Sequence, residues 1–258
     1  MKRTSWRTYR VMSGLVLVGS LALAACSPTA PATGTKPSPT PTATQSPQAL
    51  EILRHVATAN LKNAHVAINA SANTQNGNVA TTSTGTMAFN PFQADLTTTG
   101  TYLAQPLNAE EIISGNTLYV KMGTSTTWQA YPLDQAAAAS AIDPSNFSPE
   151  KITQLANVRV VGTETVEGVK VYHLQGTGRK TIAQLTGASA ALGPLGSDAN
   201  QPVTYTADLD VRTDTYQPVQ FQAHAVAGAS TADVTATFTA WNMGVTITPP
   251  PASQVTNS

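Results

Sequence analysis

The chain has 258 residues, of which 41% are hydrophobic and 6% aromatic, and its 14 basic and 14 acidic residues leave no net charge at pH 7. A single cysteine excludes an intramolecular disulfide framework and a zinc site built on several thiolates. Lys and Arg form no cluster in the body of the chain, so a nucleic-acid partner is not supported.

The first 25 residues are predicted to be an export signal. Four basic residues within the first ten precede the apolar run of residues 11–25, and the first acidic residue is Glu51. A charged segment followed by a short apolar one is typical of signal peptides. The alternative is a retained transmembrane anchor. It is disfavoured because a spanning helix needs roughly 20 apolar residues and this run has about 15.

The only cysteine, Cys26, directly follows that run. The stretch Leu23-Ala24-Ala25-Cys26 resembles the lipobox of bacterial lipoproteins. The resemblance implies that residues 1–25 are a lipoprotein signal peptide, that cleavage occurs before Cys26, and that diacylglycerol is attached to its thiol. The alternative is an ordinary cleavage site with a cysteine beside it by chance. Cleavage removes four of the 14 basic residues, which leaves ten against 14 acidic ones.

Three regions are predicted after the signal. Residues 26–46 comprise the lipidated cysteine and a disordered tether, because Pro, Thr, Ser, Ala and Gly cannot repay the entropy of ordering. In a polyproline-like form of about 3.1 Å per residue, this tether reaches roughly 60 Å. Residues 47–249 are expected to form one domain, and residues 250–258 a disordered tail.

The domain is predicted to begin with a helix over residues 47–62, in which apolar residues recur at three- and four-residue steps after Ser46-Pro47. Alternating apolar residues then predict strands over residues 66–70, 84–89, 92–96 and 118–122. The Asn90-Pro91 dipeptide is typical of a turn between the second and third of these strands.

The middle of the chain is predicted to be less regular. Residues 135–141 favour a short helix or a mobile flap, and further short helices are expected over residues 148–157 and 179–187. A loop rich in glycine and alanine continues to residue 200. Strands over residues 158–161 and 169–174 are expected to be joined by a turn at Glu167-Gly168.

The last third has the most regular alternation. Residues 203–212, 219–225 and 234–240 predict an antiparallel meander with one apolar and one polar face. In the first of these runs, Tyr205 and Leu209 are expected on the apolar face, whereas Asp208 and Asp210 are expected on the polar face.

The predicted fold class is α+β, a curved antiparallel sheet with short helices over its concave face. Many apolar-face positions are alanines, which bury little area at about 25 cal/mol per Å². The sheet is therefore expected to curve around an apolar hollow that can take an apolar ligand. The alternative is that the short helices fill this space. The candidate lining residues are Val66, Ile68, Met87, Phe89, Leu96, Leu118, Val120, Tyr205, Ala207, Leu209, Phe221, Ala223, Ala236 and Phe238.

The order of these elements, behind a lipobox and a Thr/Pro-rich tether, resembles the LppX/LprAFG family of actinobacterial lipoproteins and the wider LolA/LolB-like fold. The resemblance covers residues 47–249. It implies a half-barrel whose concave face holds lipid chains, in proteins that carry or present lipids and lipoglycans in the cell envelope. Residues 135–141 and 187–200 depart from the mycobacterial members, which leaves the cavity size open. The stretches that carry the resemblance are Leu61-Lys62-Asn63-Ala64-His65-Val66, Ile113-Ser114-Gly115-Asn116-Thr117-Leu118-Tyr119-Val120, Val161-Gly162-Thr163-Glu164-Thr165-Val166-Glu167-Gly168 and Phe238-Thr239-Ala240-Trp241-Asn242.

No catalytic or metal-binding constellation is recognised. Asp208 and Asp210 favour a solvated strand face over a calcium pair, because nothing supplies the rest of a calcium loop. Ser148-Pro149-Glu150-Lys151 has the Ser-x-x-Lys spacing of penicillin-recognising enzymes, but the Lys-Thr-Gly strand is missing and helix capping accounts for the tetrad. The histidines lie on different predicted elements without an HxH or HExxH spacing: His55, His65, His173 and His224.

These observations predict a non-enzymatic lipoprotein, without cofactor or metal, that binds and carries or presents lipid or lipid-linked glycan. Its expected partners are a lipid or glycolipid ligand and the outer face of the bacterial cell membrane, reached through acylated Cys26. An envelope transporter is a further candidate partner. The alternative is an adaptor or sensor with a filled half-barrel whose polar face binds a protein or the cell wall. An outer-leaflet enzyme is the least supported hypothesis.

Overall fold

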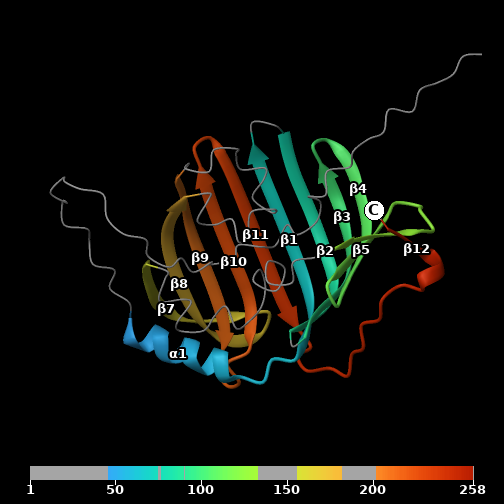
Figure 1. Cartoon of the computed structure of the whole chain (residues 1–258). Helices are drawn as coiled ribbons and strands as arrows, with labels where there is room; N and C mark the ends of the chain where they lie inside the picture. Colours follow the sequence, from blue (N-terminus) through green and yellow to red (C-terminus); the bar gives the residue numbers. More distant parts are fainter. Residues whose placement is uncertain (1–45, 75–76, 90, 133–155, 182–201, 258) are drawn as a thin grey trace, which may run out of the picture.

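A computed structural model describes residues 46–74, 77–89, 91–132, 156–181 and 202–257 (Figure 1). The described part is mostly β, with one α-helix, one short 3-10 helix and twelve strands. In chain order the elements are α1 (Pro47–Thr58), β1 (Asn63–Thr74), β2 (Gly77–Phe89), β3 (Phe92–Tyr102), β4 (Gln105–Ser114), β5 (Thr117–Met122), β6 (Trp128–Pro132), β7 (Ala156–Val166), β8 (Val169–Thr181), β9 (Pro202–Arg212), β10 (Pro218–Ala227), β11 (Ser230–Thr239), the 3-10 helix (Ala252–Gln254) and β12 (Val255–Asn257).

All twelve strands belong to one sheet, in the order β12-β6-β5-β4-β3-β2-β1-β11-β10-β9-β8-β7. Strands β1 to β6 form one meander and β7 to β11 form another, and the antiparallel pairing of β1 with β11 joins the two. Strand β12 is the exception to this pattern, because it pairs parallel to β6. Figure 1 shows a continuous curved sheet, with α1 lying at the lower ends of β7 to β10 in this view.

The first helix is confirmed but ends at Thr58, earlier than predicted. The connection from α1 to β1 is held by the side chain of Asn242, which follows the end of β11. Asn242 Nδ2 donates to the Asn60 carbonyl at 2.7 Å, and the Lys62 N–H donates to Asn242 Oδ1 at 2.9 Å. These contacts hold the connection in its non-helical path from the end of α1 to the start of β1.

Two other predicted helices are wrong where the structure describes them. Residues 156–157 begin β7 rather than ending a helix over residues 148–157. Residues 179–181 end β8 rather than beginning a helix over residues 179–187. Strand β8 stays paired with β9 as far as Thr181, opposite Pro202, and this ladder outweighs a local helical pattern with few apolar anchors. The rest of both segments, residues 135–141 and the loop over residues 187–200 lie outside the described residues.

The prediction of a disordered tail over residues 250–258 is also wrong. Ala252–Gln254 form a 3-10 helix, and Val255–Asn257 form β12. Val255 pairs with Trp128 of β6. Strands β4 and β6 are further elements that the alternation of the sequence does not predict. Strand β4 pairs with its sequence neighbours β3 and β5, whereas β6 pairs with β5 on one side and with the distant β12 on the other.

The predicted turn and meander are confirmed. Val166 pairs with Val169, so β7 and β8 are joined by the two residues Glu167 and Gly168. Both have positive φ angles, 49° and 81°, which is the conformation of the tight turns that suit the twist of a hairpin. Strands β9, β10 and β11 pair antiparallel in sequence order.

The apolar residues of the strands point to one face, which we call the apolar face; the opposite side is the polar face. Helix α1 buries Ala49, Ile52, Leu53 and Val56 against Leu174, Val203, Tyr205, Leu209 and Val211, the first of two main clusters. The second cluster includes Val66, Ile68, Met87, Leu96, Ala236 and Phe238. Phe221 contacts both, so the apolar face is continuous from β8 to β4.

Candidate functional site

The pairing register places all 14 predicted lining residues on the apolar face. Val66 lies opposite Phe238, Ala207 opposite Ala223, and Leu209 opposite Phe221. Directly opposed residues of antiparallel strands point to the same side of a sheet. Eleven of the 14 are buried, whereas Leu118, Ala207 and Phe221 are half-buried. Their role in lining a lipid cavity stays a prediction, and Cys26 lies outside the described residues.

The two clusters of the apolar face are covered differently by the described residues. The first is packed beneath α1. The second consists of strand residues, with Trp241 as its one partly buried addition from beyond β11. The Trp241 ring lies 5.6 Å from the rings of both Phe89 and Phe238, and its Nε1 donates to the Pro218 carbonyl at 2.9 Å. Trp241 therefore closes one edge of the second cluster.

A polar group lies within this apolar face on β2, β3 and β4. Ser83 and Thr98 are directly opposed, and their hydroxyl oxygens are 2.7 Å apart. Glu111 of β4 is hydrogen-bonded to the Thr98 side chain and lies opposite Leu96 and Val120. Glu111 is only 4% exposed, and its Oε1 has no hydrogen-bond partner among the described parts of the chain.

Burial controls the protonation of Glu111. Loss of hydration raises the pKa of its carboxyl from 4.5 to about 8, against the opposing effect of the Thr98 hydrogen bond. The side chain is therefore a neutral carboxylic acid at pH 7. A neutral acid keeps one O–H donor and one carbonyl acceptor, which gives this apolar surface a directional polar contact without a charge.

Glu111 is not among the residues predicted from the sequence, although a signal for it is present. Leu107, Ala109, Glu111 and Ile113 alternate with exposed or half-exposed residues, so Glu111 occupies the apolar phase of a strand. An acid at such a position is the informative exception to a period-two pattern. Because the strand itself is not predicted, the exception could not be recognised.

A second buried polar atom on this face belongs to Tyr205. Its hydroxyl has no hydrogen-bond partner within the described residues, and burial raises its pKa to about 12. Tyr205 lies opposite Gly178, where a methyl group would come within 2.1 Å of the Tyr205 hydroxyl. The missing side chain at Gly178 thus makes the space that the Tyr205 ring occupies.

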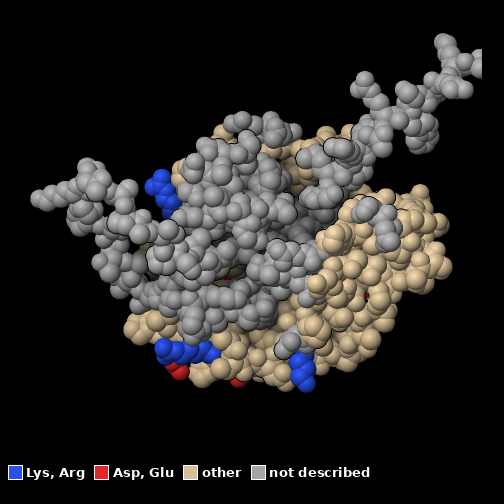
Figure 2. Space-filling view, viewed as in Figure 1, with Lys and Arg blue, Asp and Glu red and all other residues tan. Residues whose placement is uncertain are grey.

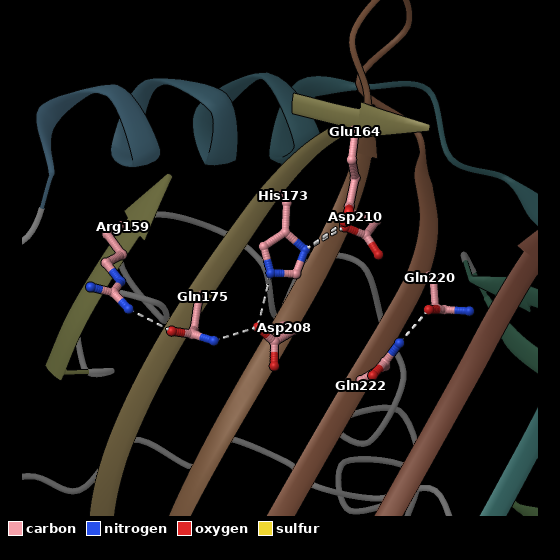
Figure 3. Close-up of polar contacts among 8 residues, drawn as sticks. All are labelled: Arg159, Glu164, His173, Gln175, Asp208, Asp210, Gln220 and Gln222. Atoms are coloured by element: carbon pink, nitrogen blue, oxygen red, sulfur yellow. Dashed lines mark hydrogen bonds and ion pairs between the residues drawn. The ribbon is translucent and has the colours of Figure 1, made fainter. Parts of the chain in front are cut away.

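The polar face carries a cluster of titratable residues around His173 (Figure 3). His173 Nδ1 lies 2.8 Å from Asp210 Oδ1 and 3.0 Å from Glu164 Oε1, and Nε2 lies 3.1 Å from Asp208 Oδ1. The polar chain continues through Gln175, whose Nε2 donates to Asp208, to Arg159 at the edge strand β7. Figure 3 shows these side chains on one side of β7, β8 and β9.

The charges of this cluster favour a protonated histidine. Partial burial is the largest single influence and lowers the pKa of His173, but Asp210, Asp208 and Glu164 together raise it above 6.5. Burial also raises the pKa of Asp210, partly offset by its contact with His173. With both imidazole nitrogens facing carboxylate oxygens, the cluster is satisfied as a histidinium held by acids.

This cluster corrects the prediction of a solvated strand face at Asp208 and Asp210, because Asp210 is only 4% exposed. It also brings one of the four histidines together with acidic residues. The ligand atoms of Glu164, His173 and Asp210 lie within 4.8 Å of one another, which is compatible with a cation. The ion pairs account for the same arrangement without one.

The polar face also has a groove of about 400 Å³ over β1, β2, β3 and β11. Its walls include hydroxyl, amide and carboxylate groups, and Thr82 donates to Asn69 across it at 2.8 Å. Its lining residues are Asn69, Ala70, Ser71, Ala80, Thr81, Thr82, Thr99, Gly100, Asp233 and Thr235.

Figure 2 shows only scattered charged side chains on the face in view, with Lys and Arg forming no patch among the residues described.

Comparisons with solved structures define the class of protein. LppX from Mycobacterium tuberculosis superposes with a TM-score of 0.53 at 18% identity, covering 79% of this chain and 100% of LppX. LprF from Mycobacterium bovis gives a TM-score of 0.51 at 17% identity, covering 80% and 98%. The fold is therefore LppX-like. A LolA-superfamily protein from Nitrosomonas europaea gives 0.27 at 10% identity, covering 73% and 91%.

The family follows from the sequence of the domain. A family model described as LppX_LprAFG lipoprotein matches residues 47–247, and the chain belongs to this family. Membership implies a location in the cell envelope, in a family of lipoproteins that are generally non-enzymatic. A search of curated proteins finds no match. Among the described residues, no helix has the length and apolar character needed to cross a membrane.

Replacing Glu111 by glutamine should stabilise the protein increasingly as pH rises. The folded chain retains the Glu111 proton up to about pH 8, whereas the unfolded chain releases it near pH 4.5. Stability from this group is thus lost as pH rises across that window, by up to about 3 to 5 kcal/mol. Urea unfolding from pH 4.5 to 8.5 measures the difference between Glu111→Gln and wild type. Glu110→Gln, at an exposed neighbour, should keep the wild-type slope; a parallel slope for Glu111→Gln would contradict the assignment.

Replacing Asp210 by asparagine should lower the pKa of His173, because it removes the nearest carboxylate. The His173 contribution to stability is present below pH 6.5 and is lost as pH rises through its raised folded pKa. NMR titration of the His173 ring protons measures this pKa directly. Asp233→Asn, beside His224, should leave it unchanged. An unchanged His173 pKa in Asp210→Asn would show that the pairing does not form.

Proposed function

We propose that the protein is a membrane-anchored lipoprotein that binds lipid or lipid-linked glycan on the apolar face of its sheet and carries or presents it in the cell envelope. The observation that carries this proposal is the continuous apolar face. One cluster of that face is packed beneath α1, while the second is composed of strand residues and Trp241 in the described part of the chain. An apolar concave surface with few polar groups is the usual form of a site for an apolar ligand.

The half-barrel shape belongs to the same proposal. The sheet is curved, and its apolar face is rich in small residues such as Ala207, Ala223 and Ala236. Acyl chains that leave water for such a surface gain about 0.8 kcal/mol per buried methylene. Binding of this kind needs no catalytic group, which is consistent with a carrier that does not change its ligand.

The anchor completes the proposal. Acylation of Cys26 would hold the chain at the membrane, and the tether over residues 26–46 would let the domain work at a distance from it. One acyl chain gives marginal membrane binding, whereas two give stable anchoring, so diacylglycerol on Cys26 suits a resident envelope protein.

The adaptor hypothesis has one observation in its favour, the groove of about 400 Å³ on the polar face. Its walls carry hydroxyl and amide groups suited to a polar partner such as a peptide or a glycan. Lipid binding remains the better supported function. A groove on the polar face would explain binding of a polar partner, but it would not explain why the opposite face of the sheet is apolar from β8 to β4.

Lipid should co-purify with the full chain carrying Cys26→Ala when it is produced in its native host. Organic extraction followed by mass spectrometry detects a bound lipid of any class. Ala236→Phe should reduce the bound lipid several-fold, because it adds a large side chain to the apolar face. Thr237→Phe places the same side chain on the polar face and should leave the amount unchanged. Repeated absence of lipid from the chain that carries Cys26→Ala alone would favour the adaptor hypothesis.

Radiolabelled palmitate should label the wild-type protein, and Cys26→Ala should abolish the label. The thiol is the only site in the chain at which a lipobox can direct diacylglycerol attachment. Ser27→Ala, at the next residue, serves as the matched control and should retain the label. An unlabelled wild-type protein would overturn the anchor while leaving lipid binding by the apolar face unaffected.

A further inference from the structure

We propose that Ser83, Thr98 and Glu111 form a polar subsite within the apolar face, and that this subsite takes an uncharged acyl-ester group of the bound lipid. The inference rests on the proposed function, lipid binding by this face, and assigns one specific contact within it. It concerns residues that neither the alternation of the predicted strands nor the family resemblance identifies.

The subsite is built on three adjacent strands. Ser83 and Thr98 lie opposite each other on β2 and β3, and their hydroxyls are 2.7 Å apart. Thr98 is 1% exposed and connects this pair to Glu111 on β4. Because regular strands fix the three backbones, the polar atoms hold their positions relative to one another before any ligand arrives.

One atom of the subsite has no partner. Glu111 Oε1 is fully buried and has no hydrogen-bond partner within the described residues. A buried polar atom without a partner costs about 1 to 3 kcal/mol, which a fold normally avoids. A glutamate at a position flanked by Leu96 and Val120 therefore requires an explanation beyond packing, since leucine or valine would fill the same space.

The chemistry of the partner follows from the protonation state. A neutral carboxyl group donates through its O–H, so the partner must supply an acceptor oxygen. The partner must also be uncharged, because the nearest described cation on the neighbouring strand, Lys121, lies on the polar face and is paired with Glu110 at 2.6 Å. A phosphate or carboxylate brought to Glu111 would be left without a counter-charge.

The neighbours of Glu111 select an ester among uncharged acceptors. On the apolar face, Leu96 and Val120 flank it across the strands, and Ile113 follows it along β4. A group that reaches Glu111 is therefore bordered by hydrocarbon. An acyl ester has this form, with an alkyl chain attached to a carbonyl acceptor. Unlike an alcohol, it brings no donor of its own that would need a further partner in an apolar site.

The test compares two fluorescent probes with equal chain lengths, an NBD-labelled diacylglycerol and the corresponding dialkylglycerol, which lacks the ester carbonyls. Both are titrated into the purified full chain carrying Cys26→Ala, and binding is followed by NBD fluorescence. With the wild-type subsite, the ester probe should bind about three- to ten-fold more tightly than the ether probe, because one hydrogen bond contributes an affinity difference of this size.

Glu111→Leu should abolish this preference while it retains or strengthens binding of the ether probe, because leucine removes the O–H but keeps the apolar surface. Glu111→Gln should retain part of the preference, since its amide can still donate. Glu110→Gln is the matched control on the opposite face and should behave like the wild type. Unfolding curves for each variant establish that the domain is folded.

The outcomes separate this inference from the proposed function. Equal affinities of the wild type for the two probes, or a preference that survives in Glu111→Leu, would overturn the subsite and leave lipid binding intact. Failure of both probes to bind the wild type would overturn the proposed function, and the subsite with it. A preference that is lost in Glu111→Leu and partly kept in Glu111→Gln supports the assignment.

Discussion

The pairing of β1 with β11 is the constraint on which the rest of the structure depends. Every other antiparallel pair joins strands that are sequence neighbours, whereas this pair joins His65 to Thr239 and the two meanders to each other. Its register is fixed at one end by Asn242, which follows β11 and bonds to the connection before β1. A slip of one residue would turn the apolar residues of one strand to the opposite face, so Val66 and Phe238 would no longer lie together.

Because the pairing registers keep the alternation of every strand in phase, the two faces of the sheet have opposite chemistry, and among the described residues each face carries one buried acid. On the apolar face this acid is Glu111, a carboxyl kept neutral by burial. On the polar face it is Asp210, an acid buried beside a histidine. The second is satisfied within the protein, because Asp210 Oδ1 is hydrogen-bonded to His173 Nδ1 at 2.8 Å. Glu111, in contrast, has one carboxyl oxygen, Oε1, without a hydrogen-bond partner among the described residues. Asp210 is therefore part of a structural ion pair, whereas Glu111 has an atom that a ligand could contact.

Features that depend on local alternation could be predicted from the sequence. Features that depend on pairing with distant strands could not. The face of Tyr205, Leu209 and the other lining residues could be derived, because a period of two is a property of each strand alone. The strand character of residues 179–181 could not, because it depends on pairing with β9, more than 20 residues further along the chain. The His173 cluster also depends on register: Glu164, His173 and Asp210 lie on three strands, and no spacing along the chain brings them together.

The position of Glu111 connects stability to the proposed function. A carboxyl group with a pKa of about 8 makes the folded state less stable at neutral pH than a hydrocarbon side chain would, since the unfolded chain releases its proton freely. Binding energy can offset such a cost only if the ligand supplies the missing acceptor. An apolar face alone would take any acyl chain in any position, because hydrophobic contact is not directional. One neutral acid held by Thr98 and Ser83 adds direction, so under the proposed function it would set where along the sheet a lipid lies and which lipids fit.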